Sequence, residues 1–341
     1  MSSSFLTSLP WLAAAFACLA SAATVALILK RGWIVALDLP NERSLHSVPT
    51  PRSGGAGLMA GLFCAALPAS LMNISWLWLE TLMAATLAGV SLLDDRRGLS
   101  VGTRLAAHCA VALTYAAYLL HLPDPGFEQI RGGQILWGAA VALALVVAIN
   151  FYNFMDGSNG MAGGMACIGF GAYAWGAWPG HLALTMLSLA VAGASAGFLP
   201  FNLRGKIFFG DSGSVPLGFL AGAVGLHGAH AGLWPLWFPL LVFAPFLLDA
   251  GFTLTRRMVR GEQFWTAHRQ HYYQRVVLMG ATHGQLAGGE YALMLVCASG
   301  AIWALGLDTT GRWIIFATIG VCFLLLMRVI DARWRKFTAG A

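Results

Sequence analysis

Long apolar runs alternate with short polar segments along almost the whole chain. Most runs are roughly 17–22 residues long, which is the length that an α-helix needs to cross the hydrocarbon core of a membrane. The pattern therefore predicts about eleven transmembrane helices. Their expected bounds are 10–29, 54–72, 76–93, 102–121, 133–150, 162–178, 181–199, 214–231, 233–254, 285–305 and 312–328.

The composition supports this interpretation. Hydrophobic residues make up 58% of the 341 residues and charged residues only 10%, which excludes an ordinary soluble domain. The 41 glycines suit helices that pack closely in lipid. We expect an all-α, polytopic membrane bundle that forms a single domain over residues 1–341, with no separate soluble domain.

The positive charges predict how the bundle is oriented. Lys30 and Arg31 follow the first apolar run, so the N-terminus should be periplasmic and the end of the first helix cytoplasmic. With alternating topology, all but Arg131 and Arg312 of the 20 basic residues fall on the cytoplasmic side. The C-terminus is then cytoplasmic, and the basic tail after Val329 is expected to be solvated. The net charge of +6 indicates orientation and contact with anionic lipid or phosphate, not with nucleic acid.

The polar segment 150–164 interrupts two apolar runs. Asn150, Asn153 and Asp156 recur every three residues, which would place them along one face of a helical turn. Amide and carboxylate oxygens are ligands that Mg²⁺ prefers. The alternative is a polar helix break whose side chains are satisfied by their neighbours.

Two further acidic motifs lie at expected cytoplasmic helix ends. Asp94 and Asp95 directly follow the segment 76–93, at a helix end where the dipole disfavours negative charge, so they need a cation. Neighbouring arginines could supply it in a surface ion pair, or a divalent metal could bind. Asp211 lies in the segment 210–214 where the helix expected at 214–231 begins, and there it could cap the helix or hold Mg²⁺ beside a phosphate.

Two longer cytoplasmic segments complete the set. The loop 38–55 contains His46, Arg52 and Gly54-Gly55; it is either a solvated connector or an anion-facing loop whose glycines permit close approach to a ligand. The segment 256–275 is either a membrane-surface anchor or a diphosphate-binding segment. Its candidate donors are His268, Arg269 and His271.

These motifs resemble those of the polyprenyl-phosphate N-acetylhexosamine-1-phosphate transferases. Leu-Asp-Asp at 93–95, Asn-x-x-Asn-x-x-Asp-Gly at 150–157 and Phe-Gly-Asp-Ser-Gly-Ser at 209–214 occur in the order and spacing of that family. The segment Ala-His-Arg-x-His-Tyr-Tyr-Gln-Arg at 267–275 is most similar to the O-antigen branch, which handles UDP-N-acetyl-fucosamine or UDP-N-acetyl-quinovosamine.

The resemblance implies a magnesium-dependent enzyme, with Mn²⁺ as a substitute metal. It would transfer an N-acetylhexosamine-1-phosphate of the FucNAc, QuiNAc or GlcNAc type from a UDP-sugar to undecaprenyl phosphate and release UMP. This reaction would initiate O-antigen or another cell-envelope polysaccharide at the bacterial inner membrane, with the site facing the cytoplasm. The expected partners are the two substrates and the membrane, with a homodimer also compatible.

The resemblance also implies roles for individual residues. Asp211 would be the main metal ligand, with Asn153 assisting. Asp94 would act as base toward the lipid phosphate, with Asp95 as its partner, and Asp156 would be the acid of the central motif. Many relatives carry a second acid where this chain has Asn159, so we assign that amide to substrate contact rather than catalysis. The expected substrate-binding residues are Arg104, Asn150, Asn159, His268, Arg269, His271, Arg52 and His46.

Two other classes fit parts of the pattern. An intramembrane prenyltransferase also uses acids and Mg²⁺, but a further aspartate should stand four residues after the first, where this chain has Gly98. A lipid-linked-sugar transporter or flippase should show charges deep inside helices and a symmetric repeat. Here the charged motifs lie at helix ends.

Overall fold

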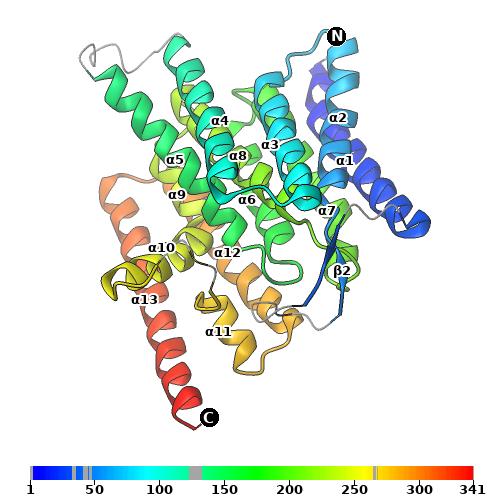
Figure 1. Ribbon diagram of the computed structural model, residues 1–341. Coiled ribbons are helices and arrows are strands. Elements are labelled where there is room, and N and C mark those ends of the chain that lie inside the picture. The colour runs from blue at the N-terminus through cyan, green and yellow to red at the C-terminus, as the bar shows by residue number, and fades with distance from the viewer. Residues whose placement is uncertain are drawn as a thin grey trace.

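The computed structural model describes residues 3–32, 36–40, 45, 48–122, 133–263, 266 and 268–340, with only the backbone of residues 3–6. Figure 1 shows a bundle of helices with the N-terminus at one end and the C-terminus at the other. The predicted helical class is confirmed. The described elements are α1 (Ser3–Arg31), β1 (Leu37–Asp38), β2 (Thr50–Pro51), α2 (Gly55–Leu71), α3 (Trp78–Arg97), α4 (Val101–His121), α5 (Gln134–Phe154), α6 (Met161–Ala177), α7 (Leu182–Asn202), α8 (Asp211–His230), α9 (Trp237–Val242), α10 (Ala244–Val259), α11 (Tyr272–Leu278), α12 (His283–Leu305) and α13 (Thr309–Ala339).

Small residues let α1 and α7 approach closely. A Cβ placed on Gly193 would collide with the carbonyl oxygen of Ala14, and one placed on Gly197 would collide with that of Cys18. Such contacts bring helix backbones together where no hydrophobic driving force between helices operates. The role of glycine in helix packing that the composition predicted is thus visible at this pair.

Helix α8 forms the centre of the bundle. It packs against α3 and α5, and most of its residues are buried. Its first residue is Asp211, so the buried centre of the fold also positions one of the predicted site residues.

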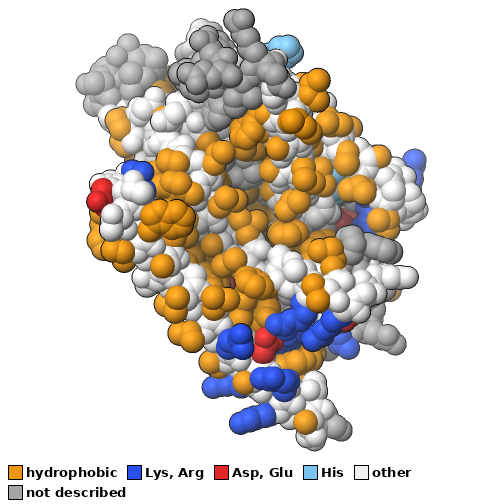
Figure 2. Space-filling model, turned by 90° about the vertical axis from the view of Figure 1, so that its left-hand side faces the viewer, with side chains coloured by type: hydrophobic (Ala, Val, Ile, Leu, Met, Phe, Trp, Pro, Cys, Tyr) orange, Lys and Arg blue, Asp and Glu red, His pale blue; other side chains and the backbone are white. Residues whose placement is uncertain are grey.

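Five described helices are long and apolar enough to cross a membrane by length and composition: α1 from Thr7, α5, α7, α12 and α13. Helix α2 is apolar but shorter. One face of the molecule is covered largely by hydrophobic side chains, with a cluster of Lys and Arg side chains toward one end (Figure 2). These features support a membrane protein, whereas the eleven spans and the orientation of the termini stay predictions.

The predicted single helix over 233–254 is wrong. The structure divides this segment into α9 and α10, with Phe243 between them. Pro245 is the second residue of α10 and has no N–H to donate to the preceding turn, so it begins a new helix instead of continuing the old one. Helix α10 then continues to Val259, past the expected end.

The basic tail after Val329 is helical in the structure. Helix α13 continues to Ala339, although its hydropathy changes sharply at Arg328. Hydropathy reports where a helix leaves the membrane rather than where it ends, and Arg and Lys are good helix formers. Asp331 and Trp334 on this extension line a cavity, so this part is more than a solvated end.

Candidate active site

Backbone hydrogen bonds join the first loop to the segment before α8. The Phe208 N–H donates to the Pro51 carbonyl at 2.7 Å, and the Gly54 N–H donates to the Phe208 carbonyl at 2.9 Å. The β1–β2 ribbon therefore lies against the start of α8. This arrangement holds Arg52 close to the helix end that carries Asp211.

Glycines make this contact possible. A Cβ on Gly55 would collide with the backbone of Ser212, and one on Gly210 would lie 2.8 Å from the Arg52 carbonyl oxygen. Gly210 also has a φ of +63°, in the left-handed region that favours glycine. The close approach expected at Gly54-Gly55 is therefore made to the protein's own backbone.

Three carboxylates and two guanidinium groups form the polar centre. Arg104 Nη1 lies 3.2 Å from Asp94 Oδ2 and 3.5 Å from Asp211 Oδ2, so it bridges α3 and α8. Arg52 Nη2 lies 3.0 Å from Asp95 Oδ1. The structure thus brings together five of the predicted site residues, from three helices and a loop.

The C-terminal end of α3 holds the Asp94 carboxylate in place. Its Oδ1 accepts a hydrogen bond from the Leu99 N–H at 2.6 Å, and its carbonyl accepts one from Gly98 at 2.7 Å. Gly98 ends α3 with a φ of +64°, which turns the chain back over the carboxylate. The Asp-Asp pair therefore lies just past the apolar part of α3, which ends at Leu93.

The excess of negative charge changes the acidity of the cluster. Burial raises the pKa of Asp95 to about 6, although Arg52 acts to lower it. Burial also raises the pKa of Asp211, while Arg104 and Arg52 lower it. Each of these carboxylates also experiences repulsion from Asp94 and Asp38. A bound cation would relieve this repulsion.

Magnesium fits this donor set if a substrate supplies part of the coordination. No group of three His, Cys, Asp or Glu side chains within the described residues could form a metal site alone. However, Asp94 Oδ2 and Asp211 Oδ2 converge on one nitrogen of Arg104, and Asp95 Oδ2 is buried without a hydrogen-bond partner there. Proteins usually hold Mg²⁺ through one or two carboxylates together with phosphate oxygens and water.

The central motif ends α5 beside the first turn of α8. Asn153 Oδ1 accepts a hydrogen bond from Ser214 Oγ at 2.6 Å, three residues after Asp211. Burial raises the pKa of Asp156 well above its usual range, and the charges of Asp211 and Asp38 raise it further. Asn153 and Asp156 therefore border the carboxylate cluster.

The other two amides of the motif make local contacts. Asn150 Nδ2 donates to the Val146 carbonyl one turn earlier in α5, at 2.7 Å. Asn159 Nδ2 would lie 3.2 Å from a Cβ placed on Gly205, so this amide faces the connection between α7 and α8. Neither residue has a hydrogen bond to the carboxylate cluster among those recorded within the described ranges. Their roles in substrate binding stay predictions.

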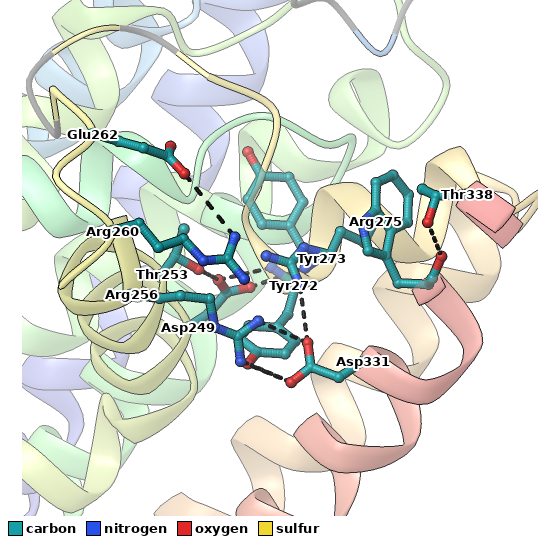
Figure 3. A network of polar contacts seen from close by, with 11 residues as sticks. Asp249, Thr253, Arg256, Arg260, Glu262, Tyr272, Tyr273, Arg275, Asp331 and Thr338 are labelled. Atoms are coloured by element: carbon teal, nitrogen blue, oxygen red, sulfur yellow. Dashed lines mark hydrogen bonds and ion pairs between the residues drawn. The ribbon is translucent and has the colours of Figure 1, made fainter. Parts of the chain in front are cut away.

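The histidine segment docks on the end of α5. Asp249 in α10 accepts hydrogen bonds from the N–H groups of Tyr272 and Tyr273, both at 2.9 Å (Figure 3). Asp249 Oδ1 also lies 3.2 Å from His271 Nδ1. The His271 ring centroid lies 6.2 Å from that of Phe154, just before the central motif turns. This acid therefore positions the start of α11.

The remaining predicted donors differ in their surroundings. The ring centroids of His268 and His271 lie 4.9 Å apart. Burial lowers the pKa of His268 to about 4, with His271 and Arg257 adding to the effect, so its ring is neutral near pH 7. Arg269 is exposed, and His46 lies outside the described residues.

An apolar cavity of about 360 Å³ lies between α5, α8, α9 and α10. On α5 its lining extends from Trp137 to Tyr152, which corresponds to a length on the order of 20 Å at 1.5 Å per residue. Aliphatic and aromatic side chains such as Val141, Leu240 and Phe246 form the walls. The cavity ends beside the central motif and suits a long hydrocarbon chain.

A family model described as Glycosyl transferase family 4 matches residues 54–229. The decaprenyl-phosphate N-acetylglucosaminephosphotransferase of Mycobacterium leprae (strain TN) is 30% identical over 303 residues, which cover 78% of this chain and 76% of that protein. The undecaprenyl-phosphate alpha-N-acetylglucosaminyl 1-phosphate transferase of Yersinia pestis is 29% identical over 321 residues, or 88% and 85% of the two chains. This chain belongs to glycosyl transferase family 4.

Membership of glycosyl transferase family 4 confirms the predicted resemblance, and the chain is a phosphoglycosyl transferase. The matched range contains Asp94, Asp95, the central motif and Asp211. It ends before the histidine segment, so the assignment of the diphosphate-binding residues depends on geometry and sequence pattern.

Sequence reasoning missed three residues that organise this candidate site. Asp249 was detectable as an acid within an apolar segment, because such an acid is usually paired and functional. Asp38 contributes to the raised pKa of Asp95, Asp156 and Asp211, but its strand had no pattern that could be recognised. Asn202 accepts from the Gly160 N–H at 2.6 Å and donates to the Ile207 carbonyl at 2.9 Å, a tertiary contact without any local sequence pattern.

Proposed function

We propose that the enzyme transfers an N-acetylhexosamine-1-phosphate from a UDP-sugar to undecaprenyl phosphate, with Mg²⁺, and releases UMP. The convergence of Asp94, Asp95 and Asp211 on Arg104 and Arg52, beside an apolar cavity, is the observation that carries this proposal. A carboxylate cluster suits a metal-bound diphosphate, and the cavity suits a polyprenyl chain.

The proposed reaction exchanges one phosphoanhydride for another. An oxygen of the acceptor phosphate forms a bond to the β-phosphorus of the UDP-sugar. The bond between that phosphorus and the bridging oxygen breaks, and UMP leaves with the electron pair. Charge is conserved because one diphosphate is consumed and another is formed. Such transfers depend mainly on positioning and charge stabilisation.

Each side chain of the cluster would have a separate role in the transfer. A bound Mg²⁺ would supply charge neutralisation at the diphosphate. Asp211 and Asn153 would hold the metal, while Asp94 would accept any proton that the acceptor phosphate carries. Asp95 orients Arg52 through their ion pair at 3.0 Å. Arg104 is placed to exchange its carboxylate contacts for phosphate oxygens when the substrates bind.

The histidine segment would bind the donor diphosphate. Asp249 holds His271 near Phe154, and His268 lies beside it. Because its pKa is lowered to about 4, His268 would act as a neutral hydrogen-bond donor at physiological pH. Arg269 would then contribute the positive charge.

The identities of the donor sugar and of the pathway are the most specific parts of the proposal. The names of the two relatives indicate N-acetylglucosamine, whereas the 267–275 segment resembles the branch that uses 6-deoxy sugars. We place the reaction at the bacterial inner membrane with the site facing the cytoplasm, where soluble UDP-sugars are available. The product would begin O-antigen or another cell-envelope polysaccharide.

A donor panel tests the proposal. The purified full-length enzyme, in detergent or nanodiscs with undecaprenyl phosphate and Mg²⁺, is incubated with UDP-GlcNAc, UDP-FucNAc and UDP-QuiNAc. We expect lipid-linked product and stoichiometric UMP with at least one donor. A folded enzyme that forms no product with any of these donors would contradict the proposal and favour a lipid-linked-sugar transporter.

A further inference from the structure

A second cavity, of about 730 Å³, lies between α10, α11 and the extension of α13. It shares no lining residue with the apolar cavity beside α5 and contains none of the carboxylates of the active site. One wall is formed by Phe252 and Arg256 on α10 and by Arg260 directly after its last residue; the three are spaced four residues apart and so share one face. The wall on α13 consists of Leu324, Met327, Arg328, Asp331, Trp334 and Arg335.

Positive charge dominates this cavity. Five arginines line it, namely Arg256, Arg260, Arg275, Arg328 and Arg335. One carboxylate, Asp331, lies in the wall, and Glu262 lies 4.0 Å from Arg260 at its edge. Five positive charges against two negative ones leave a formal excess of three.

The aspartate is shared between two of the arginines. Asp331 accepts hydrogen bonds from both terminal nitrogens of Arg256, at 2.8 and 2.7 Å, and from Arg275 at 2.9 Å (Figure 3). Burial lowers the pKa of Arg275, and the neighbouring charge of Arg256 lowers it further. One carboxylate therefore does not neutralise this pair, and an additional anion would be stabilised here.

The other side of the cavity is apolar and faces the membrane region. Leu324 and Met327 belong to the apolar part of α13, a candidate membrane span, and the nearby Val321 and Leu325 are exposed. Arg328 is the first charged residue after this stretch. Figure 2 shows Lys and Arg side chains gathered at the end of a broad hydrophobic face. Charge and apolar surface thus meet at this cavity, as they do where a membrane span reaches the lipid headgroups.

We propose that this cavity binds the phosphate headgroup of an anionic membrane phospholipid. Basic pockets between helices at a membrane surface suit such headgroups, and the cavity volume falls within the range of about 300–1,000 Å³ of small-molecule sites. The guanidinium groups contact the phosphate, and the acyl chains follow the exposed apolar face of α13. Arg328 and Arg335, exposed and without an ion pair among the described contacts, supply the accessible donors.

Native mass spectrometry of the full-length protein in detergent tests the site. Phosphatidylglycerol is titrated onto wild type and onto Arg328→Gln/Arg335→Gln. The matched control is Arg333→Gln/Lys336→Gln, which removes the same charge from the same helix but outside the cavity lining. We expect the first pair to weaken phosphatidylglycerol binding about tenfold and the control less than about twofold. Equal weakening by both pairs, or no weakening by the first, overturns the proposal.

Competitors distinguish the possible sources of the phosphate. Phosphatidylcholine should not bind in this concentration range, because it carries no net charge. Displacement of phosphatidylglycerol by an equal concentration of undecaprenyl phosphate would assign the cavity to the acceptor instead and overturn the proposal. Displacement by inorganic phosphate at the same concentration would overturn it as well. Size-exclusion elution like that of wild type shows that each variant is folded.

Discussion

Two regions of this protein bring arginines into contact with aspartates, but their net charges have opposite signs. In the candidate active site, Arg52 and Arg104 face Asp94, Asp95 and Asp211, so negative charge exceeds positive charge. In the α10–α13 cavity, five arginines face one aspartate in the wall. Since both regions use the same ion-pair chemistry, the balance of charges rather than the residue type decides what each can bind.

The pKa values express this difference. Burial and mutual repulsion raise the pKa of Asp95 and Asp211, which indicates a site that gains from a cation. Burial and the charge of Arg256 lower the pKa of Arg275, which indicates a site that gains from an anion. The first region is suited to a metal-bound diphosphate and the second to a lipid phosphate.

Removal of one charge from the acidic cluster should have the largest effect. We expect Asp211→Asn to lower metal-dependent UMP release on the order of a thousandfold, because the amide cannot neutralise the metal. Asp308→Asn is the matched control: Asp308 caps α13 outside the site, and asparagine caps helices equally well. Similar turnover in both variants would show that Asp211 is only a helix-end residue.

The bridging arginine should show the next largest effect. Arg104→Gln removes the charge that both Asp94 and Asp211 contact, and we expect turnover to fall about a hundredfold. Arg104→Lys keeps the charge and should retain activity within about tenfold. Steady-state UMP release measures both variants. Equal losses in the two would mean that the guanidinium geometry, not its charge, is required.

The acid limb of the pH profile should depend on Arg52. Because the pKa of Asp95 is raised to about 6, its carboxyl is neutral below that pH and loses the ion pair with Arg52. Turnover should therefore fall as the pH drops through about 6. Arg52→Gln removes an influence that lowers this pKa, so the limb should move to higher pH and maximal turnover should fall by roughly tenfold.

A substitution of a second arginine tests whether the loss of any nearby positive charge has the same effect. Arg97→Gln alters an exposed arginine at the end of the same helix as Asp95. Its acid limb should stay where it is in wild type. A limb that does not move in Arg52→Gln, or one that moves equally in both variants, would contradict the assignment to Asp95.

The smallest effect is expected at the edge of the cluster. Ser214→Ala removes the hydroxyl that donates to Asn153 at 2.6 Å, and we expect a two- to tenfold loss of turnover, the range of one hydrogen bond. Ser212→Ala is the control, because within the described residues the hydrogen bond of Ser212 Oγ goes to the Phe209 carbonyl, at 3.4 Å, and not to Asn153. An equal loss in Ser212→Ala would attribute the effect to packing at the start of α8.

Part of this site could be predicted from the sequence. The pattern predicts Asp94, Asp95, Asn153 and Asp211 on one side of the membrane, because alternate ends of membrane helices meet on the same side, and the structure brings these residues together. Which arginine pairs with which acid could not be predicted, because Arg52 reaches Asp95 only through the contact between β2 and the segment before α8. That contact depends on tertiary packing.

The fold, like the site, could be predicted from the sequence only in part. Apolar runs identified the helices of the bundle, because hydropathy reports membrane burial directly. The same measure failed at 233–254, where the apolar character continues through Phe243 although Pro245 begins a new helix. It also failed after Arg328, because the charged part of α13 has no long apolar run that would reveal a helix.

Metal binding tests the central claim most directly. Mn²⁺ serves as a paramagnetic substitute for Mg²⁺, and electron paramagnetic resonance counts the bound ions in the presence of UDP-GlcNAc. The carboxylate cluster predicts one tightly bound ion in wild type and in Asp308→Asn, and a loss of about tenfold or more in affinity in Asp211→Asn. Undiminished Mn²⁺ binding in Asp211→Asn, with the variant folded, would contradict the assignment of this cluster as the metal site.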